Sequence, residues 1–230
     1  MKAPGRLIAS GRDSEIFDYG PGLVLRRSRA RRSLEEEANV MRFLSEHGYP
    51  APRVGELSAD GADLVMERID GPTMLEVMMQ RPWTVPGHAK TLAALHQRLH
   101  RLPAPEWLAP FGAAGDRLLH LDLHPLNVIL SPRGPVLIDW TNAARGAEAT
   151  DVAATWLLMA CAEIPAGRMR RAMGAMLRWL FVRTFLAQFS RSAVQAALPA
   201  VVEWKCQDRN MRPSEIEAMR DLLRRESGGR

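Results

Sequence analysis

The segment at residues 120–139 constrains this chain more than any other part, because polar residues there flank a short apolar stretch. Asp122 stands five residues before Asn127, close enough for both side chains to lie on one tight loop. A second aspartate, Asp139, follows the apolar stretch. Two carboxylates and an amide in this order form a candidate site for chemistry.

The apolar stretch between Asn127 and Asp139 predicts a β-hairpin. Val128–Leu130 and Val136–Ile138 are short apolar runs, and residues 132–135, Pro-Arg-Gly-Pro, have the composition of a turn. A hairpin would return the chain to the loop and would place Asp139 beside Asn127.

Phosphoryl transfer from a nucleotide needs three groups of this kind. One carboxylate accepts the proton of the attacking hydroxyl, while an amide oxygen and a second carboxylate hold magnesium against the phosphates. Asp122, Asn127 and Asp139 supply two carboxylates and one amide, and their spacing suits that job.

The motif His-Leu-Asp-Leu-His-Pro-Leu-Asn at residues 120–127, followed by Ile-Asp-Trp at 138–140, resembles the aminoglycoside phosphotransferase (APH), or kinase-like, family. Protein kinases share the pattern, but in them the second aspartate is followed by Phe-Gly. Here Trp140 and Thr141 follow it, which is more similar to the APH group. The resemblance implies that Asp122 is the catalytic base and that Asn127 and Asp139 are the magnesium ligands.

The resemblance implies an α+β, two-lobed protein-kinase-like fold. A small antiparallel-sheet N-terminal lobe at 1–71 would bind the nucleotide, and a mainly helical C-terminal lobe at 72–230 would carry the catalytic loop and the substrate site. Gly71-Pro72 breaks the chain at the expected boundary. The implied activity transfers the γ-phosphate of ATP or GTP, with Mg²⁺, to a hydroxyl of a small molecule such as an antibiotic, sugar or amino alcohol.

Two other functions stay open at this stage. In an extended strand His120, Asp122 and His124 would share one face, as the zinc or iron ligands of a metal-dependent hydrolase would. That interpretation leaves Asn127 and Asp139 unused, and a structural role in supporting the loop is favoured for His120. The second alternative is a catalytically weak, nucleotide-binding regulatory protein of kinase-like fold.

The first 28 residues predict a twisted antiparallel sheet with strands at Leu7–Ala9, Glu15–Asp18 and Leu23–Arg26. The loop Ser10–Ser14 lies where a kinase-like fold covers the phosphates, so Ser14 is a candidate phosphate contact. Its single glycine is also compatible with an ordinary turn.

The resemblance assigns the basic residue of the third strand to Arg26, where protein kinases have lysine. A guanidinium can neutralise phosphate charge and grip a carboxylate at the same time. Its partner would be Glu37. A capping box at Ser33–Glu36 predicts the start of the helix that carries Glu37, and Gly48 predicts its end. Arg27 is the competing candidate, but alternation places it on the opposite face.

The stretch Leu64–Gly71 resembles the last strand of the small lobe and the hinge that follows. The resemblance implies that the backbone from Glu67 to Ile69 binds the purine. Further along, helical spacing predicts buried roles for His96 and His100. Asp151 would be either a helix N-cap or, as the resemblance suggests, a buried acid that fixes the catalytic loop.

Helical spacing continues through residues 168–190, with Met173, Met176 and Phe181 on one stripe. Core packing is favoured for this stripe over the lining of an adaptable substrate pocket. A break of the next helix is expected at Pro199.

Composition sets the remaining expectations. The 230 residues are 47% hydrophobic and 25% charged, no stretch resembles a membrane span or a secretion signal, and two cysteines suggest no disulfide framework, so a cytoplasmic location is expected. Residues 150–230 hold 13 basic and 8 acidic residues and carry the whole net charge of +5. Helical spacing indicates solvated faces rather than a nucleic-acid surface.

The expected partner is a small-molecule alcohol, with no nucleic acid and no membrane. A basic C-terminal part is less suited to polycationic aminoglycosides than to a neutral or anionic alcohol. Because the chain is short for the family, a homodimer stays open.

Overall fold

The computed structural model describes all residues except 12, 113–114, 162–167, 209–210 and 228–230. The contacts between residues divide the chain into two compact units. Unit 1 comprises Met1–Thr73 and Asn127–Ala143, and unit 2 comprises Met74–Leu126 and Ala144–Arg230. Whether these units are separate domains, with the boundary at residue 71, stays a prediction.

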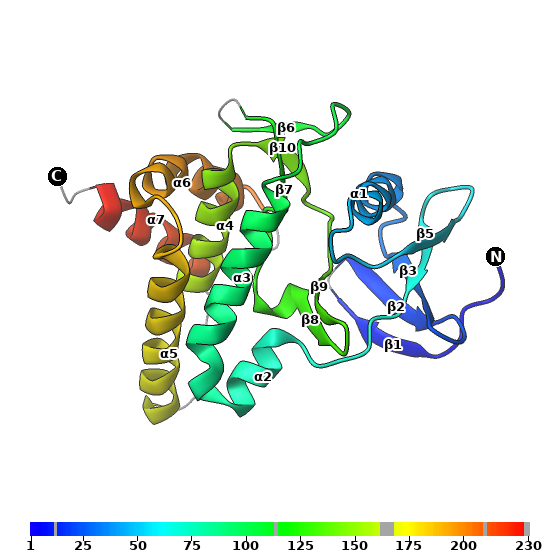
Figure 1. The fold of residues 1–230 in the computed structure, drawn as a ribbon, viewed down its shortest axis with the longest axis horizontal. Coiled ribbons are helices and arrows are strands. Elements are labelled where there is room, and N and C mark those ends of the chain that lie inside the picture. Colours follow the sequence, from blue (N-terminus) through cyan, green and yellow to red (C-terminus); the bar gives the residue numbers. More distant parts are fainter. Residues whose placement is uncertain (12, 113–114, 162–167, 209–210, 228–230) are drawn as a thin grey trace. The chain divides into compact units, whose positions relative to one another are not determined.

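Unit 1 contains a five-stranded antiparallel sheet in the order β1-β2-β3-β5-β4 (Figure 1). Its strands are β1 (Leu7–Ser10), β2 (Ser14–Asp18), β3 (Leu23–Ser28), β4 (Val54–Leu57) and β5 (Asp63–Glu67). The three N-terminal strands confirm the prediction within two residues at each end. The central strand β3 is hydrogen-bonded to β2 on one side and to β5 on the other. Its inward-facing side chains are therefore well placed to hold a buried functional group.

Helix α1 (Glu35–Glu46) contacts β4 and buries Ala38, Val40, Met41 and Leu44. It ends where predicted, at Gly48, whose φ of 66° favours glycine. The predicted capping box is wrong, because the N-cap is Leu34 and makes no side-chain cap. The Ser33 hydroxyl instead accepts from the Glu35 amide, one residue earlier than a capping box requires.

The predicted hairpin forms as β8 (Val128–Ser131) and β9 (Gly134–Leu137), with Val128 opposite Leu137. Its turn is shorter than expected, because Ser131 pairs directly with Gly134 and the Ser131 hydroxyl donates to the Gly134 carbonyl. The segment after Gly71 lies against β8: a Cβ at residue 71 would be 2.4 Å from the Leu130 carbonyl oxygen, so only glycine fits.

Unit 2 is mainly helical (Figure 1). Its elements are α2 (Met74–Gln80), a 3-10 turn η1 (Pro82–Thr84), α3 (Val85–Leu99), α4 (Glu148–Cys161), α5 (Arg168–Leu186), α6 (Arg191–Cys206) and α7 (Pro213–Ser227), with a small sheet of β6 (Pro110–Phe111), β10 (Ala144–Gly146) and β7 (Arg117–Leu119). A further 3-10 turn, η2 (Pro125–Asn127), precedes β8. Helix α4 is buried along most of its length and packs against α5, α6 and α7, while α3 packs against α5.

Three expectations about these helices are wrong. Met173 and Met176 are more than half exposed, whereas Phe181 of the same predicted stripe is buried as expected, together with Phe185. Helix α6 continues through Pro199 rather than breaking there. Asp151 is not an N-cap, because α4 begins three residues earlier.

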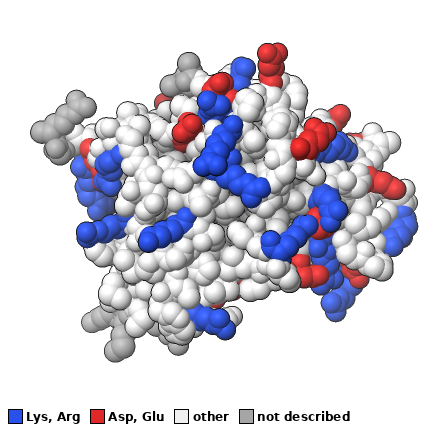
Figure 2. Space-filling model, viewed as in Figure 1, with Lys and Arg blue, Asp and Glu red and all other residues white. Residues whose placement is uncertain are grey.

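Charged side chains are spread over the face shown in Figure 2, with acidic residues among the basic ones. No helix in the described ranges is long and apolar enough to cross a membrane.

Candidate active site

Arg26 is the centre of a buried polar cluster in unit 1. Its Nη1 lies 2.7 Å from Glu37 Oε1, and its Nε donates to the Ser14 hydroxyl at 3.1 Å. Its Nη2 lies 3.2 Å from Asp139 Oδ1. The ion pair expected between Arg26 and Glu37 is therefore present, and the structure gathers three other predicted site residues around the Arg26 guanidinium.

Thr141 also belongs to this cluster, and the sequence did not single it out. Its hydroxyl donates to Asp139 Oδ1 at 2.8 Å and accepts from Arg26 Nη2 at 2.9 Å. The only signal available in the sequence was its place two residues after Asp139.

Burial controls the charges in this cluster. Desolvation raises the pKa of Glu37 to about 7, although Arg26 opposes the shift, and the negative Asp139 adds to it. For Arg26, burial lowers the pKa, but the carboxylates of Glu37 and Asp139 outweigh burial and raise it overall. The Asp139 side chain is 41% exposed, compared with 5% for Glu37, so Asp139 is the carboxylate of the cluster that solvent and ligands can reach.

The hairpin brings the two predicted magnesium ligands close in the backbone. Ile138, the residue before Asp139, donates its amide to the Asn127 carbonyl at 2.9 Å. Asp139 has a φ of 64°, a conformation that aspartate tolerates better than most residues. The next side chain, Trp140, is buried and donates from Nε1 to the Leu137 carbonyl, which fixes the end of the hairpin. Amide and carboxylate oxygens are the donors that magnesium prefers.

In the structure, two backbone amides of the predicted hinge are already hydrogen-bonded, so fewer groups are available to bind the base. The Glu67 amide donates to the Arg53 carbonyl and the Arg68 amide to the Gly22 carbonyl, so both are already used within unit 1. The Glu67 carboxylate pairs with Arg133 at 2.8 Å, which links β5 to the hairpin turn. Ile69 is half-buried and remains the best candidate for binding the base through its backbone.

In unit 2 the loop at residues 120–124 is held by buried groups from α3 and α4. Asp151 Oδ1 accepts the Leu121 amide at 2.7 Å, and its Oδ2 lies 2.9 Å from His100 Nε2. Leu121 has a φ of 59°, an uncommon conformation for leucine that this anchor supports. The Thr155 hydroxyl donates to the Leu123 carbonyl. The interpretation of Asp151 as a buried acid that fixes the loop is thus confirmed.

Burial would raise the pKa of Asp151, but His96 and His100 outweigh it and hold that pKa well below its ordinary value. His120 is fully buried, and its Nδ1 accepts the Asp122 amide, which matches the favoured role in supporting the loop. Among the described residues, the only three-residue group with the geometry of a metal site is His96, His100 and Asp151. The alternative ligand set of His120, Asp122 and His124 is therefore wrong.

Asp122 itself lies between two nitrogen-bearing groups of unit 2. Lys205 Nζ is 3.2 Å from Oδ1, and His124 Nε2 is 3.7 Å from Oδ2. The Asp122 side chain is 22% exposed. No pattern in the sequence indicated Lys205, which is 83 residues from Asp122 along the chain.

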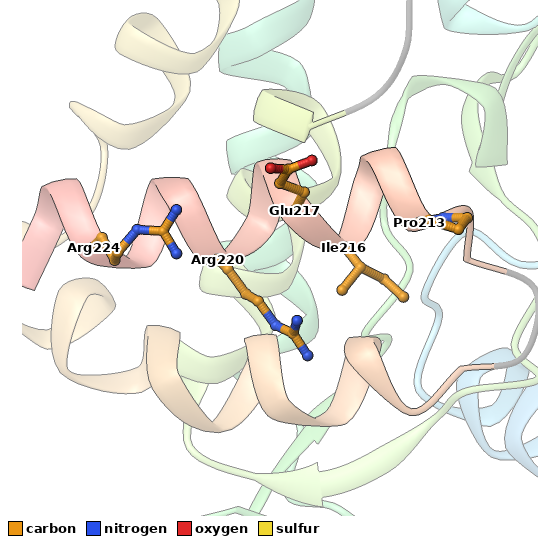
Figure 3. A pocket seen from close by; sticks show the side chains of 5 residues that line it. All are labelled: Pro213, Ile216, Glu217, Arg220 and Arg224. Atoms are coloured by element: carbon orange, nitrogen blue, oxygen red, sulfur yellow. The ribbon is translucent and has the colours of Figure 1, made fainter.

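A surface hollow along α7 contains none of the predicted site residues. Figure 3 shows its lining, which comes from that one helix: Pro213, Ile216, Glu217, Arg220 and Arg224. The hollow therefore plays no part in the candidate active site.

Comparison with known proteins decides the family. The sequence profile of the APH phosphotransferase enzyme family matches residues 5–117 and 106–189, which is most of the chain. The chain belongs to this family. No curated protein matches the chain at a significant level.

Solved structures of similar fold agree with this membership. The apo form of a thermostable mutant of aminoglycoside phosphotransferase APH(4)-Ia is 16% identical, with a TM-score of 0.68 over 98% of this chain and 95% of that one. ADP-bound aminoglycoside phosphotransferase APH(2'')-Ib is also 16% identical, with a TM-score of 0.61 over 95% and 91%. Amicoumacin kinase hAmiN is 14% identical, with a TM-score of 0.54 over 97% and 88%. These likenesses confirm the predicted fold class, an antiparallel N-terminal sheet followed by a mainly helical part.

Proposed function

We propose that this phosphotransferase moves the γ-phosphate of ATP or GTP, with Mg²⁺, to a hydroxyl group of a small molecule. The observation that carries the proposal is the cluster in unit 1, where the Arg26 guanidinium lies 2.7 Å from Glu37 Oε1 and 3.2 Å from Asp139 Oδ1. A buried cation beside an exposed carboxylate suits a site that binds both phosphate and metal.

Each group has a distinct role in the proposed reaction. Asn127 and Asp139 would hold magnesium, which supplies charge neutralisation on the phosphates when it is bound. Arg26, braced by Glu37, would neutralise phosphate charge, and the Ser14 hydroxyl would contact the phosphates. The backbone of Ile69 would bind the base. Because the transition state of phosphoryl transfer is loose, positioning and electrostatics supply most of the catalysis.

Asp122 is the proposed catalytic base. It would accept a hydrogen bond from the acceptor hydroxyl, orient that oxygen toward the γ-phosphorus and take its proton as the new P–O bond forms. Its loop is held by the buried Asp151, which supports this role, since a base acts only when it is held in place.

The acceptor we favour is a neutral or anionic alcohol. Asp122 is already paired with the cation of Lys205, so it offers less attraction to a cationic substrate than a lone carboxylate would. The similar structures include complexes of APH(2'')-IIa with streptomycin and with gentamicin, which are antibiotic ligands of that protein. Action on an antibiotic by this chain would therefore need acidic groups beyond the proposed base.

The proposal is tested by thermal unfolding with ATP and GTP, each with and without Mg²⁺. A ligand at about 100 times its Kd adds about 2.7 kcal/mol to the free energy of unfolding. We expect a magnesium-dependent rise in Tm for the wild type, a loss of that dependence in Asp139→Ala, and normal nucleotide binding with poor transfer in Asp122→Ala.

Asp60→Ala serves as the control, because Asp60 is an exposed aspartate of unit 1 outside the cluster. It should keep the full nucleotide response. Unchanged magnesium dependence in Asp139→Ala would contradict the metal assignment. If the wild type binds nucleotide and Mg²⁺ but no alcohol stimulates turnover, the regulatory alternative replaces the proposed enzyme.

A further inference from the structure

Lys205 interrupts an otherwise apolar face of α6. The buried residues of this helix are Val194, Leu198, Val201, Val202 and Lys205, which recur at helical spacing. Lys205 is only 4% exposed. A position that would suit leucine therefore holds an ammonium group inside unit 2.

Lysine is also a rare choice in this chain. Only three of its 31 basic residues are lysines, at positions 2, 90 and 205. Lysine delivers a compact point charge at the end of an apolar stem, whereas arginine presents a broad planar fork. The apolar stem of Lys205 continues the buried face of α6, while its ammonium group can contact one small acceptor.

That acceptor is the proposed catalytic base. Lys205 Nζ lies 3.2 Å from Asp122 Oδ1, within hydrogen-bond distance, and 4.5 Å from the centre of the Trp204 ring. The other oxygen, Oδ2, lies 3.7 Å from His124 Nε2. The two carboxylate oxygens therefore have different surroundings, which a freely rotating carboxylate would not keep.

Stability alone does not explain this lysine. A buried ion pair contributes little net free energy, and ordering a lysine side chain adds an entropic cost. A methionine of similar length would fill the same space without desolvating a charge. What distinguishes the site is its contact with Asp122.

We infer that Lys205 is a positioning residue that fixes the orientation of Asp122 for phosphoryl transfer; this inference rests on the proposed function. The bond to Oδ1 restricts rotation of the carboxylate, so the acceptor oxygen meets a base that is already oriented. Misplacing a catalytic group by about 1 Å can cost about 100-fold in rate, so the bond affects kcat far more than nucleotide binding.

A double-mutant cycle on the full chain tests this inference, with magnesium-dependent hydrolysis of ATP by water as the readout, because it needs no identified acceptor. We expect Lys205→Met to lower kcat about 10- to 100-fold with the KM for ATP changed less than about twofold. Lys205→Arg should recover only part of the lost kcat, because the cation returns but its planar fork fits this small target, Asp122, less well. In an Asp122→Asn background, Lys205→Met should change kcat less than about twofold, because its effect passes through Asp122.

Lys90→Met is the matched control, because Lys90 is an exposed lysine on α3 of the same unit. It should leave kcat unchanged. If Lys205→Met proves unfolded by circular dichroism, Lys205→Gln takes its place in the same cycle.

Three outcomes would overturn the inference. The first is a wild-type kcat in Lys205→Met, and the second is an equal loss in the wild-type and Asp122→Asn backgrounds, which would mean that Lys205 acts independently of the base. The third is the absence of magnesium-dependent turnover in the wild type, which would overturn the proposed function as well. The first two leave the proposed function standing, so the two failures are distinguishable.

Discussion

At the scale of single residues, Arg26 is a charged side chain held in a buried position, which carries a desolvation cost. We propose that Arg26 takes the place of the lysine of protein kinases, and its fork contacts both Glu37 and Asp139. A lysine offers only a point charge and could not span both partners in the same planar geometry. The longer, forked side chain therefore provides a physical reason for the substitution.

Glu37 makes the stability of the protein depend on pH. Its folded-state pKa of about 7 is above the ordinary value of 4.5, so the folded state holds this proton more tightly than the unfolded state does. Its contribution to stability is full below about pH 4.5 and is lost as the pH rises through about 7. We expect the free energy of unfolding of the wild type, relative to Glu37→Gln, to fall by about 1–3 kcal/mol between pH 5 and pH 8.

Urea unfolding at several pH values measures this difference. Glu36→Gln is the control, because Glu36 is the exposed neighbour on the same helix. Curves for wild type and Glu37→Gln that stay parallel across the range would show that the Glu37 carboxyl titrates normally.

At the scale of elements, α4 supports the loop at residues 120–124, which carries the proposed base. Its Asp151 accepts from the loop backbone and contacts a histidine of α3, so one carboxylate links three segments. The Leu121 amide and His100 both bond to this buried carboxylate, and removing it leaves them without their acceptor.

Asp151→Ala should therefore lower the free energy of unfolding by about 3–5 kcal/mol, because it leaves the Leu121 amide and His100 without their acceptor. Asp151→Asn keeps one acceptor oxygen and should lose about half as much. Chemical denaturation measures both values. Glu148→Ala, at an exposed position of the same helix, should stay within about 0.5 kcal/mol of the wild type. A similarly small effect of Asp151→Ala would show that the loop does not depend on this anchor.

At the scale of the whole molecule, charge distribution bears on the choice of substrate. Residues 150–230 carry 13 basic and 8 acidic residues, and the proposed base is paired with a lysine. At an effective dielectric constant of about 20, two like charges 8 Å apart repel by about 2 kcal/mol. Each positive charge of a polycationic substrate would experience repulsion of this kind from the basic residues.

We therefore expect a phosphotransfer screen to favour neutral and anionic alcohols. Glycerol, glycerate and 3-amino-1,2-propanediol form a matched set that differs mainly in charge, and gentamicin supplies a polycation. The kcat/KM for gentamicin should be at least about tenfold below that of the best neutral or anionic acceptor in the screen. A polycation as the best acceptor would show that local acidic groups override the net charge.

The sequence by itself determined the parts of the site that are close along the chain. Asn127, the hairpin and Asp139 form one local unit, because strand alternation and turn composition act over a few residues. The strands that carry Ser14 and Arg26 were predictable for the same reason. The resemblance to the APH family supplied the link from Arg26 to Glu37, which the ion pair bears out.

Only the tertiary structure decided the contacts between distant segments. Thr141 joined the cluster through Arg26, 115 residues away, and Lys205 reached Asp122 across 83 residues. The exposure of Met173 and Met176 was likewise set by which face of α5 its neighbours cover. Periodicity shows that a residue lies on a given face of a helix or strand, but the partner of that face depends on the packing of the entire chain.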